Sequence, residues 1–121
     1  MGTVLLVDDM EDTAEAVKDY FKNLGVTCWT AKNSDEALKL LTEQTPSLVL
    51  LDIRLDGSRL DGFGILQEAS KLPTRSKMKI YMITGYHEPE KQARAKELGA
   101  DDYLTKPLPL EKLKEILKSL G

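Results

Sequence analysis

The chain alternates five times between a short apolar or β-rich run and a segment in which apolar residues recur at helical spacing. The predicted strands cover residues 3–7, 26–31, 47–51, 78–83 and 102–105, and the helical segments follow at 10–24, 37–41, 63–72, 87–98 and 110–120. Apolar strands that alternate with helices are typical of a parallel sheet covered on both faces. The pattern therefore predicts an α/β fold, with three layers and a doubly wound, five-stranded parallel sheet. It leaves the strand order open.

Composition limits the class of protein further. A chain of 121 residues, 41% hydrophobic and 31% charged, is the size of one globular domain, so we expect a single domain over 1–121. A net charge of −3 argues against direct nucleic-acid binding. The sequence has no apolar run long enough to span a membrane, and its first residues lack the pattern of a signal peptide. Its one cysteine, Cys28, cannot form an internal disulfide. These features predict a cytoplasmic domain.

Polar residues stand at the ends of four of the five predicted strands. Asp8 and Asp9 follow the first strand, Asp52 ends the third, Thr84 follows the fourth, and Lys106 follows the fifth. Singly, each has an ordinary structural explanation, such as a helix cap, a turn residue or a surface lysine. Together they should meet at one edge of the sheet, where open parallel sheets bind ligands.

Three carboxylates at one edge repel one another unless a cation offsets their charge. Oxygen ligands without sulfur favour a hard ion, and Mg²⁺ fits best, with Mn²⁺ as the alternative. A carboxylate beside such an ion can attack a phosphoryl group and form an acyl phosphate. Lys106 and the Thr84 hydroxyl would each bind one phosphoryl oxygen.

Four motifs carry a resemblance to a known family. The segments 4–9 (VLLVDD), 50–52 (LLD), 83–85 (ITG) and 103–107 (YLTKP) resemble, in order and spacing, the receiver domains of two-component response regulators. The resemblance covers the whole chain. It implies a CheY-like, flavodoxin-like fold with strand order 2-1-3-4-5.

The resemblance also implies a role for each matching residue. Asp52 would be the phospho-acceptor. The metal would be held by Asp8, Asp9, Asp52 and the backbone carbonyl of Arg54, and Asp9 would be the more direct ligand of the acidic pair. Lys106 would bind the phosphate, and the peptide bond between Lys106 and Pro107 is expected to be cis.

Thr84 and Tyr103 would form the switch. Phosphorylation would draw the Thr84 hydroxyl inward and let Tyr103 turn from exposed to buried, which repacks the elements at 87–98, 102–105 and 110–120. We expect the 87–98 helix to be mobile, because only Ala93, Ala95 and Leu98 are suited to packing it.

The resemblance also implies partners. A histidine kinase or phosphotransfer protein would supply the phosphate, and a protein target or attached output domain, absent from this chain, would receive the signal. The domain would catalyse only its own phosphorylation and dephosphorylation, and we favour a monomer before phosphorylation.

One segment departs from the family pattern. Residues 53–60 are two residues longer than usual, and Asp56 replaces the usual proline. Asp56 and Gly57 predict a turn. Arg54 and Tyr86 hold positions that influence how water reaches the acyl phosphate, so the sequence leaves the lifetime of the phosphorylated state open.

The main alternative is a phosphatase of the haloacid dehalogenase type with Asp52 as its nucleophile. Such an enzyme needs a second aspartate two residues further on, where this chain has Arg54. A flavin or nucleotide binder is disfavoured because no glycine-rich loop follows the first strand.

Overall fold

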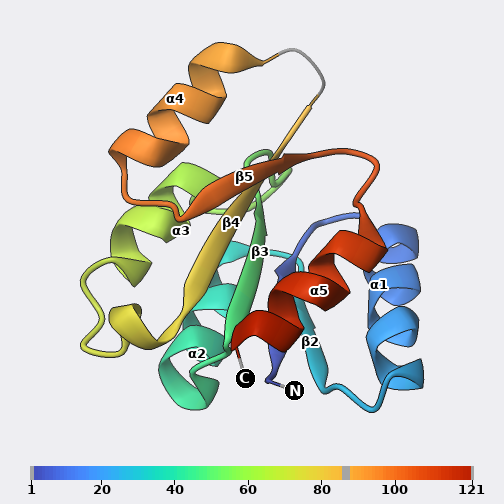
Figure 1. Cartoon of the computed structure of the whole chain (residues 1–121). Coiled ribbons are helices and arrows are strands. Elements are labelled where there is room, and N and C mark those ends of the chain that lie inside the picture. Colours follow the sequence, from blue (N-terminus) through green and yellow to red (C-terminus); the bar gives the residue numbers. More distant parts are fainter. Residues whose placement is uncertain (1, 86–87, 121) are drawn as a thin grey trace.

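The strands form one parallel sheet in the order β2-β1-β3-β4-β5 (Figure 1), which confirms the predicted fold class and strand order. The computed structural model describes residues 2–85 and 88–120. Its strands are β1 (Val4–Val7), β2 (Cys28–Ala31), β3 (Leu48–Asp52), β4 (Lys79–Thr84) and β5 (Asp102–Thr105). Its helices are α1 (Glu11–Asn23), α2 (Ser34–Gln44), α3 (Gly62–Ala69), α4 (Pro89–Glu97) and α5 (Leu110–Leu120), with a 3₁₀ turn at Arg75–Lys77.

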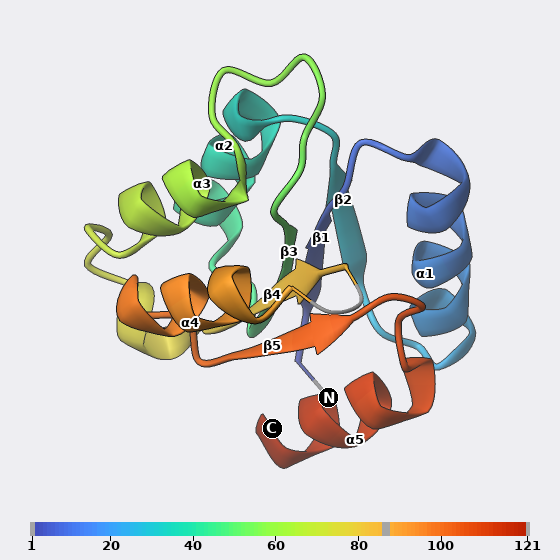
Figure 2. The same cartoon turned by 90° about the horizontal axis from the view of Figure 1, so that it is seen from above.

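Helices cover both faces of the sheet, so the molecule has the three predicted layers. Helices α1 and α5 lie against one face, and α2, α3 and α4 lie against the other (Figure 2). Side chains alternate between the two apolar clusters along each inner strand. In β3, Leu50 belongs to the cluster under α1 and α5, whereas Leu51 belongs to the cluster under α2, α3 and α4. Because both faces are covered, β1 is apolar throughout and β3 is apolar up to Asp52.

Helix α2 begins with a capping box, for which the sequence offers Asn33 and, three residues later, Glu36. The Asn33 side chain accepts a hydrogen bond from the backbone N–H of Glu36 (2.9 Å), and the Glu36 carboxylate accepts one from the N–H of Lys32 (3.0 Å). This satisfies two backbone donors at the start of the helix.

Several boundaries differ from the predictions by one to three residues. Strand β2 begins at Cys28 rather than Val26, and α3 ends at Ala69 rather than Leu72. The last predicted turn of α3 and the 3₁₀ turn after it belong to the connection around Pro73. Helix α4 has Pro89 in its first turn, a favoured position for proline, and the predicted start at His87 lies outside the described residues.

Helix α4 is thinly packed, as the sequence predicts, but not through every residue that we expected. Ala95 is fully buried and Leu98 is half-buried against the core, whereas Ala93 is exposed. Ala93 therefore does not pack the helix, because it lies two positions from Ala95 and points away from the sheet.

Among the described residues, no helix has the length and apolar character needed to cross a membrane.

Candidate functional site

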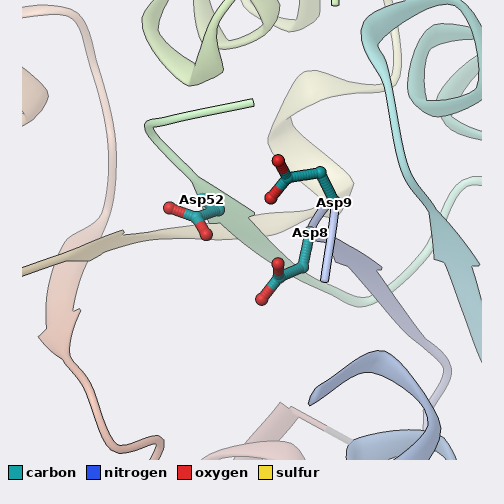
Figure 3. Close-up of side chains that lie close together, drawn as sticks. All are labelled: Asp8, Asp9 and Asp52. Atoms are coloured by element: carbon teal, nitrogen blue, oxygen red, sulfur yellow. The ribbon is translucent and has the colours of Figure 1, made fainter. Parts of the chain in front are cut away.

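The carboxyl ends of β1 and β3 bring three aspartates together. Asp52 is the last residue of β3, and Asp8 and Asp9 follow β1, which pairs with β3 in parallel register. One oxygen from each of the three carboxylates lies within 4.8 Å of the other two (Figure 3). The sheet topology thus assembles the acidic group that the sequence predicts.

Asp8 is the most deeply buried of the three, at 2% exposed. Its Oδ1 accepts a hydrogen bond from the backbone N–H of Met10 (2.9 Å), but its Oδ2 has no hydrogen-bond donor within the described part of the chain. Burial raises the pKa of Asp8 above its ordinary value, and the neighbouring charges of Asp52 and Asp9 add to the shift. A buried oxygen without a donor is a group that a cation can satisfy.

Lys106 supplies the positive charge nearest to the cluster. Its Nζ donates a hydrogen bond to Asp52 Oδ2 at 2.9 Å and lies 3.7 Å from Asp8 Oδ2. Burial alone would lower the pKa of Lys106, but the hydrogen bond to Asp52 and the charges of the aspartates outweigh it, so the pKa is raised. The lysine therefore remains protonated and reduces the repulsion between the carboxylates. The peptide bond to Pro107 is cis.

Thr84 lies beside the cluster at the end of β4, and Tyr103 lies on the neighbouring strand β5. Thr84 ends β4, is 3% exposed, and donates from Oγ1 to the carbonyl of Leu104 over 3.4 Å. Tyr103 in β5 is half-buried, and Nζ of Lys96 from α4 lies 5.5 Å from the centre of its ring. The tyrosine ring therefore lies at the contact between β5 and α4.

The backbone after β3 holds two of the aspartates. The N–H of Arg54 donates to Asp52 Oδ1 (3.3 Å), and the N–H of Asp56 donates to Asp9 Oδ2 (3.1 Å). The Asp56 contact comes from its main chain, and the predicted turn is present, with Gly57 at φ +75°. Tyr86, which we discussed with Arg54, lies outside the described residues.

A hollow of about 290 Å³ is lined by Asp9, Asp52 and Lys106. Glu88 and Lys91, two charged residues that the sequence did not single out, also line it. The Glu88 carboxylate accepts hydrogen bonds from the N–H of Gly85 (2.9 Å) and from Nζ of Lys91 (3.1 Å). These contacts, above all the one to Lys91, lower the pKa of Glu88. No sequence motif marks either residue. They share this hollow with Asp52 only in the folded protein.

The residues present fit a divalent cation. The available donors are all oxygens, and the buried Oδ2 of Asp8 is unsatisfied within the described residues. Such donors suit Mg²⁺, which is bound by one or two carboxylates and keeps several waters.

The fold and the acidic edge define a doubly wound α/β domain with a polar cluster beyond its strand ends. The sequence model of the response regulator receiver domain matches residues 4–118, so the chain belongs to the family of receiver domains found in response regulators. The chain is therefore a two-component signalling module rather than a metabolic enzyme.

Curated relatives agree with this assignment. The putative response regulator NtrX-like protein of Rickettsia bellii (strain RML369-C) is 40% identical over 115 residues, which are 95% of this chain and 24% of that protein. The probable transcriptional regulator ycf27 of Cyanidium caldarium is 33% identical over 117 residues, which are 97% of this chain and 45% of that protein. The chain thus spans about a quarter of the NtrX-like relative and less than half of the ycf27 protein.

Solved structures show the same fold. The receiver domain of NtrX from Brucella abortus matches with a TM-score of 0.84 and 33% identity, over 97% of this chain and 96% of that one. A CheY-like receiver domain protein from Methanospirillum hungatei JF-1 matches with a TM-score of 0.85 and 30% identity, over 98% and 92%.

Proposed function

We propose that this domain is a phosphorylation switch in which Asp52 accepts a phosphoryl group from a histidine kinase or phosphotransfer protein. The observation that carries the proposal is the Asp52 carboxylate itself. It opens onto a hollow, shares a 4.8 Å cluster with Asp8 and Asp9, and is hydrogen-bonded to Lys106.

The chemical step is a displacement at phosphorus. An Asp52 oxygen forms a bond to the phosphorus while the bond from phosphorus to the histidine nitrogen breaks, and the imidazole leaves with the electron pair and takes up a proton. Lys106 and the Thr84 hydroxyl each bind one phosphoryl oxygen. Asp8, Asp9, Asp52 and the Arg54 carbonyl would hold Mg²⁺, or Mn²⁺ in its place, which neutralises phosphoryl charge.

The signal would leave through the face formed by α4, β5 and α5. Thr84 lies next to Leu104 of β5, and within the described residues its hydroxyl makes a single long hydrogen bond of 3.4 Å, so the hydroxyl can be redirected at little cost. Tyr103 is the adjacent aromatic residue, and α4 buries only Ala95 completely. These features support a switch in which Thr84 moves inward, Tyr103 turns and α4 repacks.

The partners follow from the family. The relatives are longer than this chain, so we infer that the signal passes to an attached output domain or to a separate protein target. We place this domain in the cytoplasm and expect it to be monomeric before phosphorylation.

The proposal is tested by incubating the protein with Mg²⁺ and a small acyl phosphate, followed by intact-mass measurement. We expect one phosphoryl adduct on the wild type, none on Asp52→Asn and a full adduct on Asp19→Asn, which alters an exposed carboxylate of α1. EDTA should abolish the adduct.

An unmodified wild type, or an undiminished adduct on Asp52→Asn, would contradict the proposal. Rapid turnover of a free phosphate monoester that depends on Asp52 would instead favour the phosphatase alternative.

A further inference from the structure

The connection between β3 and α3 is tied to the start of α2 by two serines. The backbone N–H of Ser34 donates to Ser58 Oγ at 2.8 Å, and the N–H of Leu60 donates to Ser34 Oγ at 3.2 Å. We call this pair of residues, Ser34 and Ser58, the serine clasp. Ser34 is fully buried and Ser58 is partly buried, so the clasp is anchored in the interior on its Ser34 side.

The same connection reaches the acidic site at its other end. The N–H of Asp56 donates to Asp9 Oδ2 at 3.1 Å. Directly before Asp56, Leu55 is buried in the core, and the N–H of Ser58 donates to the Leu55 carbonyl (3.2 Å), which closes a turn around Asp56 and Gly57. Only Gly57 separates Asp56 from Ser58, so about 7 Å of chain joins the two residues and the position of one limits the position of the other.

Asp9 needs such a support. It is less buried than Asp8 and Asp52, and both of these carry the same charge. Repulsion therefore favours rotation of the Asp9 side chain toward solvent. The hydrogen bond from Asp56 opposes this rotation and keeps the Asp9 carboxylate beside the other two. Groups that orient a metal ligand in this way commonly change metal affinity by about 10–100-fold when they are removed.

We propose that the serine clasp positions Asp9 for metal binding, with Ser58 as the positioning residue that holds the Asp56 N–H in place. This inference rests on the proposed function, because it assigns Asp9 to the metal site. It also gives the longer connection a purpose, since the chain contacts Asp9 at Asp56 and then reaches the start of α2 at Ser58 and Leu60 before α3 begins.

The neighbouring ion pair offers a matched control. Arg59 donates to Asp35 Oδ1 at 3.2 Å across the same two segments, but the two side chains are 61% and 75% exposed. Exposed pairs of this kind contribute little to structure. Arg59→Gln should therefore leave Asp9 and the clasp unchanged.

The test is the dissociation constant for Mg²⁺ of the full chain, measured by calorimetry beside the melting temperature in EDTA. We expect Ser58→Ala to bind Mg²⁺ about 3–10-fold more weakly, a reduced form of the usual effect because it acts through Asp56. Ser58→Thr, which keeps an acceptor oxygen, should restore binding, and Arg59→Gln should bind as the wild type does. Ser34→Ala removes the other half of the clasp and should weaken binding in the same direction.

Mg²⁺ binding by Ser58→Ala and Ser34→Ala within twofold of the wild type would overturn the inference and leave the proposed function intact. Equal weakening by Ser58→Thr and Ser58→Ala would also overturn it, because the effect would then not come from the hydroxyl. A wild type that does not bind Mg²⁺ would instead contradict the proposed function itself.

Discussion

Asp8 illustrates how a single residue can oppose stability while serving a site. Its carboxylate is buried and has one oxygen without a donor among the described residues, and its pKa is raised mainly by that burial. The folded protein therefore binds a proton at Asp8 more tightly than the unfolded chain does. The protonated form of Asp8 therefore stabilises the folded protein relative to the ionised form. This stabilisation is complete below the unfolded pKa of 3.8 and is lost as the pH rises through the folded pKa.

We therefore predict that Asp8→Asn is more stable than the wild type at pH 7 in EDTA. Asparagine keeps an acceptor for the Met10 N–H and removes the buried charge, so the melting temperature should rise by about 3–6 °C for a gain of about 1 kcal/mol. The difference should shrink toward zero as the pH falls well below the unfolded value of 3.8, where Asp8 is protonated in both states. Thermal unfolding at several pH values measures both effects.

Asp19→Asn serves as the control, because it removes an exposed carboxylate and should leave the melting temperature within a degree or two. A less stable Asp8→Asn at pH 7 would mean that the attraction between Asp8 and Lys106, 3.7 Å apart, outweighs the cost of burial.

At the scale of elements, the site depends on how α3 approaches β3. The N–H of Gly62 donates to the carbonyl of Ile53 (2.8 Å), and a Cβ on Gly62 would meet backbone atoms of Asp52 and lie 2.7 Å from Cα of Ile53. The start of the helix can therefore lie this close to the end of β3 only with glycine at position 62. The Asp61 side chain caps the same end by accepting from the N–H of Gly64 (2.9 Å).

Gly62→Ala should consequently cost about 2–4 kcal/mol of unfolding free energy in urea, because the atoms it meets belong to backbone that cannot move aside. Gly57→Ala is the matched control, since it has open space but a positive φ of 75° and should cost only about 1–2 kcal/mol. Equal costs for the two variants would contradict the close approach.

The whole molecule consists of one sheet between two apolar layers. Leu50 and Leu51 are neighbours in the central strand, both are fully buried, and they belong to opposite layers. Neither layer is dispensable, because every inner strand would otherwise expose one apolar face to water.

We predict that Leu50→Ala and Leu51→Ala each cost about 2–5 kcal/mol in urea unfolding. That is a large part of the roughly 5–15 kcal/mol typical of a domain. Met10→Ala, at a side chain that is 56% exposed, should change stability by no more than about 0.5 kcal/mol. Tolerance of either leucine change would indicate that one layer is loosely packed.

Much of the fold could be predicted from local sequence signals. Asn33 and Glu36 marked the start of α2 because a cap acts within one turn of helix. The five apolar runs located the strands because both faces of the sheet are covered. The start of β2, expected at Val26, and the packing of Ala93 were predicted wrongly, because neighbouring elements decide which residues pair or pack.

Part of the candidate site could likewise be predicted from the sequence, and part of it could not. Asp8, Asp9, Asp52, Thr84 and Lys106 could be predicted as a group, because parallel strands place their carboxyl ends at one edge. Glu88, Lys91 and the serine clasp carried no such signal. Their partners lie across loops, and loop paths depend on what they pack against.

The sequence by itself determined the layered α/β fold and the acidic edge, since periodicity and strand ends are local properties of the chain. Only the tertiary structure decided which carboxylate oxygens accept hydrogen bonds and from which residues. Asp52 accepts from Lys106 and Asp9 accepts from the N–H of Asp56, whereas the buried Oδ2 of Asp8 has no donor within the described residues. The reason is physical. These contacts join residues up to 54 positions apart, so they exist only after the strands have paired and brought their carboxyl ends together.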